Sequence, residues 1–145
     1  MSLRMLFVVL LLATAACRGL DDPGASAGVF FPRYGSMGPT PAALLEGRLE
    51  INDGCLWLVK AGGARILPIW PGGYGLRAGV NPLEVIDAAG RVVAADGETL
   101  RVQGGEVMVA DARRLMGREE PSACGGNGFW VVGPITVPAE RSSTP

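Results

Sequence analysis

The sequence predicts an all-β domain, a small antiparallel barrel or sandwich of the OB-like or SH3-like kind. Glycine accounts for 22 and proline for 11 of the 145 residues, a share that is typical of a chain with many turns. The apolar runs between these residues are short and rich in valine, leucine and isoleucine. Turn signals recur at roughly ten-residue intervals, which indicates about six or seven short strands.

The first strands can be placed in order along the chain. Residues 45–51 alternate apolar and polar side chains, the period of a half-buried strand. Residues 52–54, Asn-Asp-Gly, are a hairpin turn signal. Residues 55–59 are nearly all apolar, which indicates a strand covered on both faces. In the next run, 65–70, Pro68 has no N–H to donate, which predicts an edge strand or a bulge.

The second half of the chain continues this pattern. Further strands are expected in the runs at residues 83–87, 91–94, 99–102, 106–110 and 129–132. One short helix is expected at residues 111–116, with Asp111 as its N-cap and Gly117 ending it.

The chain has room for one domain. We expect a signal peptide at residues 1–16, a tether rich in Gly, Pro, Ala and Ser at 17–41, the β domain at 42–138 and a disordered tail at 139–145. The tether contains an apolar patch at residues 29–34, Val-Phe-Phe-Pro-Arg-Tyr. This patch either docks on the domain or contacts a membrane or a partner, and docking is favoured because exposed aromatic clusters are costly in water.

The beginning of the chain has the three parts of a bacterial export signal. Arg4 supplies the positive charge, residues 5–12 the apolar stretch, and residues 13–16 the small side chains that a signal peptidase needs. The apolar stretch is too short to span a bilayer core of about 30 Å. The small residues end at Cys17, and the segment 14–17, Thr-Ala-Ala-Cys, resembles the lipobox of bacterial lipoproteins.

This resemblance implies that the Cys17 thiol carries a diacylglycerol and that the chain is cleaved on the amino side of this cysteine. Arg18 is not the aspartate that favours inner-membrane retention of enteric-type lipoproteins, so in a cell with two membranes the outer one is favoured. The alternative is an ordinary signal peptide cut near Ala16, which would leave a soluble secreted or periplasmic protein with a spare thiol. Both interpretations place the protein outside the cytoplasm.

The number of cysteines supports lipidation. An exported chain with three cysteines has one left over after a single disulfide. A lipidated Cys17 leaves Cys55 and Cys124 as a pair that would enclose most of the domain and stabilise it. A redox role would require a Cys-x-x-Cys motif or a thiol of low pKa beside a base, and the sequence shows neither pattern.

Composition argues against several function classes. The chain has no histidine, so the usual general base near neutral pH and the commonest metal ligand are missing. Its 13 basic and 14 acidic residues are mixed, without a basic run that would attract nucleic acid. Residues 73–78 match the glycine spacing of a dinucleotide-binding fingerprint. The fingerprint also needs a strand before the glycines and a helix after them. Pro71 interrupts that strand and Gly79 breaks that helix, so we do not expect a phosphate-binding loop here. We therefore expect no catalytic residues, no metal site and no cofactor.

Two sets of side chains remain as candidates. Trp70 and Tyr74 flank a glycine-rich loop and form a possible binding surface that could stack on sugar rings or fill a partner's pocket. The favoured alternative is that Trp57 and Trp130 are core residues and Trp70 plugs one end of the barrel, with Tyr74 the most exposed of the aromatic residues. Carboxylates along the strands could supply a glycoside-hydrolysing pair, although alternating charges on strands usually form a solvated face. They are Glu46, Glu50, Asp53, Glu84, Asp87, Asp96, Glu98, Glu106 and Asp111.

The sequence therefore predicts a non-enzymatic binding or assembly module of the bacterial cell envelope. A lipid on Cys17 would tether it to a membrane, and an envelope protein or a glycan would be its partner. The alternatives are a carboxylate-dependent enzyme acting on glycan and a purely structural lipoprotein. Two carboxyls about 5–9 Å apart in a cleft would favour hydrolysis, and an aromatic patch would favour binding.

Overall fold

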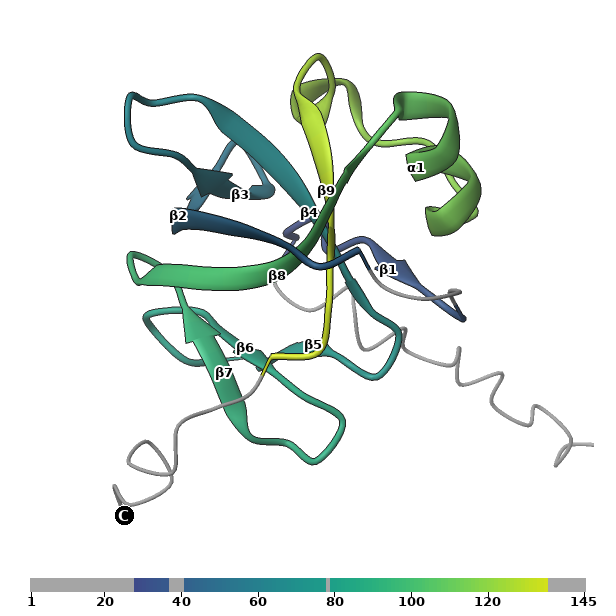
Figure 1. Ribbon diagram of the computed structural model, residues 1–145. Coiled ribbons are helices and arrows are strands. Elements are labelled where there is room, and N and C mark those ends of the chain that lie inside the picture. Colours follow the sequence, from purple (N-terminus) through teal and green to yellow (C-terminus); the bar gives the residue numbers. More distant parts are fainter. Residues whose placement is uncertain (1–27, 37–40, 78, 136–145) are drawn as a thin grey trace, which may run out of the picture.

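A closed barrel of five strands forms the centre of the structure (Figure 1). The computed structural model describes residues 28–36, 41–77 and 79–135. The expected signal peptide, the expected lipid attachment at Cys17 and the expected tail at 139–145 lie outside the described residues. In the order in which they pair, the barrel strands are β2 (Ala43–Asn52), β3 (Cys55–Val59), β4 (Arg65–Pro71), β9 (Gly128–Val132) and β8 (Thr99–Val107), which returns to β2.

The strand order is that of an OB-type barrel. When the barrel strands are numbered along the chain, they pair in the order 1-2-3-5-4, and the fourth strand pairs with the first to close the barrel. The third and fifth strands, β4 and β9, are parallel, whereas the other barrel pairs are antiparallel. The prediction of an all-β small barrel is confirmed, and the parallel pair is the departure from the expected antiparallel pairing.

The remaining elements are attached to this barrel. A three-stranded antiparallel sheet of β5 (Gly75–Arg77), β6 (Glu84–Ile86) and β7 (Val92–Ala95) lies between β4 and β8 in the chain. The connection from β8 to β9 contains helix α1 (Val109–Met116) and the 3-10 turn η1 (Ser122–Cys124). A short strand, β1 (Arg33–Tyr34), pairs in parallel with β4. In Figure 1, α1 and β1 lie on the same side of the barrel.

The helix expected at residues 111–116 is present but begins earlier. Its N-cap is Met108, so the prediction of Asp111 as N-cap is wrong; Asp111 lies within the first turn. An acidic side chain there still interacts favourably with the helix dipole. Gly117 ends the helix, as predicted, in the left-handed conformation with φ 66°.

The alternating pattern of β2 places apolar side chains inside the barrel. Leu45 and Leu49 are buried, whereas Glu46 and Arg48 are exposed. β8 alternates in the same way, and β3 is buried on both faces, as its uninterrupted apolar run predicts. Because β2 and β8 alternate apolar and polar residues, their outer face is exposed to solvent. Because β3 is apolar throughout, its outer face is covered as well as its inner one.

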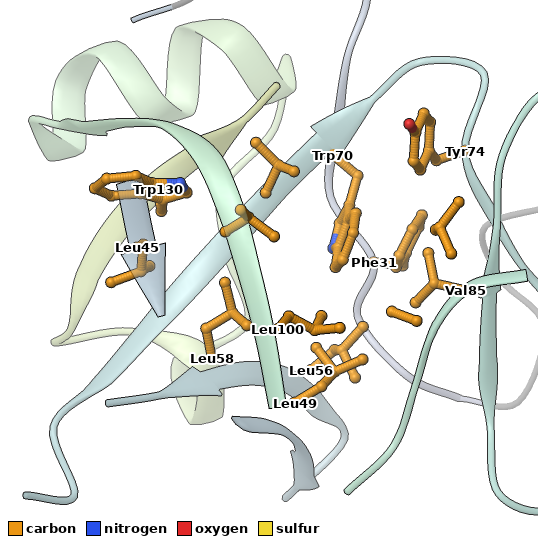
Figure 2. Close-up of a cluster of buried hydrophobic side chains, with 14 of the residues drawn as sticks. Phe31, Leu45, Leu49, Leu56, Leu58, Trp70, Tyr74, Val85, Leu100 and Trp130 are labelled. Atoms are coloured by element: carbon orange, nitrogen blue, oxygen red, sulfur yellow. The ribbon is translucent and has the colours of Figure 1, made fainter. Parts of the chain in front are cut away.

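The buried side chains form two clusters, one on each side of the barrel wall. The inner cluster fills the barrel and the end to which the three-stranded sheet is attached (Figure 2). The outer cluster covers the outside of β3, β4 and β9. Its members are Tyr34, Cys55, Trp57, Leu67, Ile69, Ala112, Cys124, Phe129 and Val131.

The apolar patch of the predicted tether closes a gap in the barrel. The paired residues of β3 and β4 end at Ile66. Pro68 lies outside this pairing, so the N–H group that proline lacks is not needed for a hydrogen bond to β3. Pro68 nevertheless pairs with β9 on the other side, so the prediction of an edge strand is wrong. The segment 30–34 fills the gap, because the Phe30 N–H donates to Gly54 O at 2.7 Å and the Trp70 N–H to Pro32 O at 2.9 Å.

This docking extends the domain towards the N-terminus. Phe31 is 1% and Tyr34 7% exposed, so the patch belongs to the core. The domain therefore begins before residue 42, the boundary that composition predicts. Glycine and proline on both sides of the patch give these residues the appearance of a linker.

Candidate functional site

The surface on which OB-type barrels usually bind ligands is covered in this protein. That surface is formed by the second and third strands with the loops between strands one and two and between strands four and five. Here the second and third strands are β3 and β4, whose outward side chains Trp57, Leu67 and Ile69 are buried in the outer cluster. Helix α1 contributes Ala112 to the same cluster. A ligand could reach this surface only if α1 and β1 moved away.

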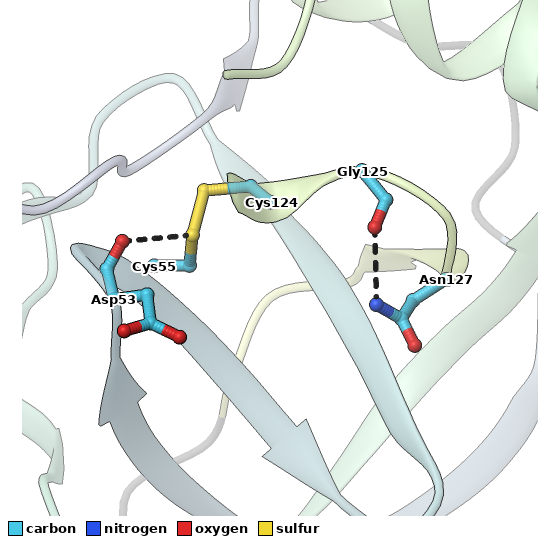
Figure 3. The surroundings of a disulfide bond; sticks show 5 residues. All are labelled: Asp53, Cys55, Cys124, Gly125 and Asn127. Atoms are coloured by element: carbon cyan, nitrogen blue, oxygen red, sulfur yellow. Dashed lines mark hydrogen bonds between the residues drawn. A yellow bond between two sulfur atoms is a disulfide. The ribbon is translucent and has the colours of Figure 1, made fainter. Parts of the chain in front are cut away.

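A disulfide fixes the two loops of this covered surface to each other (Figure 3). Cys55 follows the β2–β3 turn and Cys124 lies in the β8–β9 connection; their Cα atoms are 5.7 Å apart. Both cysteines are buried. Beyond Cys124, the Asn127 side-chain amide donates to Gly125 O at 3.2 Å and shapes the loop that leads into β9. The predicted pair is therefore present, in a setting that suits a structural bond.

The side chains of the possible aromatic binding surface, Trp70 and Tyr74, are buried. Trp70 is 0% and Tyr74 8% exposed. Phe31 stacks on Trp70 with ring centroids 5.4 Å apart, and Trp70 stacks on Tyr74 at 6.2 Å. The Tyr74 hydroxyl accepts a hydrogen bond from the Ile135 N–H at 3.0 Å. Trp70 plugs one end of the barrel, as the favoured interpretation held, but Tyr74 is buried with it.

Across the described residues, every aromatic side chain is buried except Phe30, which is half-buried. Trp57 and Trp130 are core residues, as expected. Sugar-binding surfaces typically present an aromatic face for stacking. The part of the chain that the structure describes presents no fully exposed aromatic ring.

Most of the strand carboxylates have local structural partners. Glu46 pairs with Arg101 at 3.3 Å, Glu84 with Arg77 at 2.8 Å and Asp111 with Arg114 at 2.9 Å. The side chain of Asp96 accepts a hydrogen bond from the Ile51 N–H and that of Glu98 from the Ala95 N–H, both at 3.1 Å. These contacts hold turns and neighbouring strands together.

Asp87 is a buried carboxylate on the loop between β6 and β7. Its side chain accepts hydrogen bonds from the Ala89 and Arg91 N–H groups and from Arg91 Nε, the last at 2.8 Å. The bond from the Arg91 side chain, with the backbone bonds, lowers the pKa of Asp87. A glycosidase acid needs a raised pKa to hold its proton, so the direction at Asp87 suits a turn-stabilising carboxylate and not a proton donor.

The outer surface of β2 and β8 is the open part of the barrel wall, and we refer to it as the β2–β8 face. Three cross-strand pairs form it: Leu44 opposite Gln103, Glu46 opposite Arg101, and Arg48 opposite Thr99. All six side chains are exposed, and Leu44 is 54% exposed although it is apolar. Opposite charges alternate along the face, which gives it a pattern that a complementary partner could recognise.

A shallow hollow lies at each end of the β2–β8 face. One, of about 440 Å³, lies against the β3–β4 hairpin and includes Glu50 and Lys60. The other, of about 360 Å³, lies between Leu44, Gln103 and Ile135. Glu46 and Glu50 share the first hollow, and each is paired with an arginine, Glu50 with Arg48. Both carboxylates are therefore held in ion pairs with arginines.

The outward-facing residues of the β2–β8 face could have been recognised from the sequence, although they form no motif. The alternation in β2 and β8 marks the outward positions, and the two runs together define the face once their pairing is known. The pairing itself joins strands far apart in the chain, and no local pattern predicts it.

Within the described ranges, no group of three or more histidine, cysteine, aspartate or glutamate residues could hold a metal ion. No helix in these same ranges has the length and apolar character needed to cross a membrane.

Comparison of the chain with protein-family models, with curated proteins and with solved structures returned no match.

Proposed function

We propose that this protein is a non-enzymatic binding module of the bacterial cell envelope, tethered to a membrane by a lipid on Cys17, that docks a protein partner on the β2–β8 face. One observation supports the choice of face: β1, α1 and the disulfide cover the surface of β3 and β4, and β2 and β8 stay open. The export signal and the Thr-Ala-Ala-Cys segment that ends at Cys17 support the tether.

The chemistry of the β2–β8 face favours a protein over a glycan as the partner. Protein interfaces combine an apolar contact with a polar rim of charged groups. Leu44 supplies the exposed apolar side chain, and Glu46, Arg48 and Arg101 supply charges of both signs around it. A glycan partner would instead be expected to stack on an exposed aromatic ring, which the described residues do not offer.

The place where the tether joins the domain is compatible with this use. Phe30 bridges to Cys55, and Arg33 pairs with Trp70, so the segment lies against β3 and β4. These strands are on the covered side of the barrel. A domain anchored through this segment keeps the β2–β8 face available to a partner.

The experiment has two parts, since tethering and docking can fail separately. Intact mass and membrane fractionation of the protein from its native host are compared with those of a Cys17→Ala variant. We expect the wild type to be acylated on Cys17 and to fractionate with membranes, and the variant to be soluble. A soluble, unacylated wild type would rule out the tether.

For docking, a photo-crosslinking amino acid is placed at Gln103 in the β2–β8 face and, as a control, at Arg91 in the β6–β7 hairpin, which is also exposed. We expect a discrete protein adduct from position 103, lost when Leu44→Asp or Arg101→Glu is added, and no such adduct from position 91. Adducts of equal yield from both positions, or adducts insensitive to these substitutions, would remove the β2–β8 face from the proposal.

A further inference from the structure

We propose that the protein partner of the β2–β8 face is a second copy of this chain, packed face to face about a two-fold axis that runs along the strands. The inference rests on the proposed function and names the partner for the same face. It is based on the order of the charges on β2 and β8, two strands that lie side by side in Figure 1. A surface can bind a copy of itself symmetrically only if it is complementary to itself after a two-fold rotation.

The middle row of the β2–β8 face has one charge of each sign. Glu46 on β2 stands opposite Arg101 on β8. Both side chains are exposed to solvent. The row is therefore negative on one strand and positive on the other, and its charges lie where a second molecule can reach them.

Two arrangements of a second copy keep the strands of the two faces aligned. With the axis along the strands, β2 of each copy lies over β8 of the other, so Glu46 of each copy meets Arg101 of the other. With the axis across the strands and centred on this row, β2 lies over β2, so Glu46 meets Glu46 and Arg101 meets Arg101. Like charges that face each other across an interface disfavour binding. The charges therefore select the axis along the strands.

The ion pair within each chain is compatible with this contact. It joins Arg101 Nε to Glu46 Oε2 at 3.3 Å. A guanidinium has five N–H groups to donate, and a carboxylate accepts at both of its oxygens. Each group can therefore bind one partner in its own chain and another in the second copy, and the two pairs together form a ring of four charges with alternating sign.

The same axis places the exposed apolar side chain of each copy at a hollow of the other. Leu44 of one copy lies over Gln103 of the other, because these two residues are paired across β2 and β8. Gln103 lines the hollow of about 360 Å³ at this end of the face, together with Leu44, Arg101, Pro134 and Ile135. The hollow has room for a leucine side chain, and Pro134 and Ile135 provide apolar contact. Leu44 is exposed in the single chain, and covering its apolar surface favours association.

The third row of the face also makes a compatible contact. The axis along the strands places Arg48 of each copy over Thr99 of the other. The threonine hydroxyl can accept a hydrogen bond from the guanidinium group. All three rows are therefore matched by one and the same rotation.

The tether compensates for the small size of this contact. Three cross-strand pairs from each copy form it, fewer residues than the roughly 20–30 on each side of a stable interface. We therefore expect the dimer to be weak in solution. A lipid on Cys17 would hold the copies on one membrane and raise their effective concentration.

The test identifies what is joined to the photo-crosslinking amino acid at Gln103, in the full chain and in its native host. We expect an adduct of two chains, with the crosslink in the peptide of the second copy that contains Leu44. Arg101→Glu should lower the yield of this adduct at least about tenfold, because carboxylates then face each other across the contact. The matched control is Arg114→Glu, the same change of charge on α1, which should alter the yield less than about twofold because it lies outside the contact. Thermal unfolding curves verify that each variant is folded.

An exchange of the two charges tests the axis. The double variant Glu46→Arg with Arg101→Glu again places opposite charges over each other, so its adduct should return to within about twofold of the wild-type yield. When the double variant and the wild type are expressed together, we expect each to be crosslinked to its own kind. A mixed pair would place carboxylate over carboxylate and guanidinium over guanidinium. A preference for mixed pairs would indicate the axis across the strands and would overturn the proposed arrangement.

The remaining outcomes separate this inference from the proposed function. A discrete adduct of position 103 with a different protein would exclude the second copy and leave the proposed function standing. Equal yields for Arg101→Glu and Arg114→Glu would show that the charges of the face do not determine the contact. A crosslink from position 103 to residues 136–145 of the same chain, or no adduct at all, would remove the face from both proposals. The tether is tested separately by the intact mass of the protein.

Discussion

The ring of Phe31 stacks on the ring of Trp70, with centroids 5.4 Å apart and planes inclined by 17° (Figure 2). The two residues come from parts of the chain that composition assigns to different regions, a linker and a β domain. Phe31 is 1% and Trp70 0% exposed. The end of the barrel is therefore closed by a residue of the segment that composition assigns to a linker.

Replacement of Phe31 by alanine should destabilise the domain strongly. The change removes a buried ring and leaves a cavity beside Trp70, and such truncations cost about 3–5 kcal/mol. Denaturant unfolding monitored by tryptophan fluorescence measures the loss. Phe30→Ala is the control, because Phe30 is half-buried and its truncation should cost clearly less. Equal costs at the two positions would contradict the role assigned to Phe31.

The strands were predictable because their patterns are local. The alternation of residues 45–51 and the apolar run of residues 55–59 correspond to β2 and β3, and the Asn-Asp-Gly turn between them is a hairpin. Local patterns carry no information on pairing between distant strands. The parallel pair of β4 and β9 and the docking of Phe31 both depend on such distant contacts.

The candidate site was less predictable for the same reason. Tyr74 stands next to glycines, which indicates an exposed loop, but Trp70 and Ile135 cover it in the fold. Glu46 and Arg101 are far apart in the sequence and have no motif in common; the pairing of β2 with β8 brings them to one face. The pairing of Cys55 with Cys124 was predictable because counting cysteines needs no knowledge of the fold.

Reduction of the disulfide should lower stability substantially. Cys55 and Cys124 are 69 positions apart, and a crosslink that closes a loop of this length stabilises a protein by about 4 kcal/mol in the chain-entropy account. Guanidinium unfolding with and without a reductant, and of the double variant Cys55→Ala with Cys124→Ala, measures the difference. Cys17→Ala serves as the control and should leave the midpoint unchanged. A reduced protein that unfolds at the same midpoint as the oxidised one would contradict the stabilising role.

The Asp87–Arg91 contact should contribute to stability in a pH-dependent way. The hydrogen bond from the Arg91 side chain holds the pKa of Asp87 below its usual value, so the contribution is present above the pKa of the unfolded chain, about 3.9, and is lost as the pH falls through the folded pKa. We expect Asp87→Asn to be less stable than the wild type at neutral pH, and the difference to shrink below about pH 4. Unfolding midpoints measured across this range provide the check, and a difference independent of pH would contradict it.

Tyr34 should give the opposite dependence at high pH. Burial, together with the nearby Tyr74, raises the pKa of Tyr34 above 10.0, so its contribution to stability is present below about pH 10 and is lost as the pH rises through the folded pKa. Its hydroxyl donates to Val132 O at 2.7 Å. Tyr34→Phe leaves this oxygen without its donor, at a cost of about 1–3 kcal/mol, and should flatten the loss of stability that the wild type shows above about pH 10. Alkaline unfolding of the two proteins compares the slopes.

Gly104, in β8, should not tolerate a side chain. It pairs with Val132 of β9 on one side and with Ala43 of β2 on the other. A Cβ at this position would overlap the Val131 carbonyl oxygen and would lie 2.6 Å from Trp130 Nε1. Because Trp130 is buried in the inner cluster, its ring has no free space into which it could move.

Gly104→Ala therefore forces β8 away from β9, and overpacking of this kind costs about 3 kcal/mol or more. The control is Gly126→Ala in the loop before β9, where the glycine also has a positive φ of 79° but no atom lies within 4 Å of the added Cβ. The left-handed backbone alone should cost the control about 1 kcal/mol. Thermal unfolding of both variants separates the two effects: a Gly104→Ala protein as stable as the Gly126→Ala control would show that β8 can shift at this position without loss of the barrel.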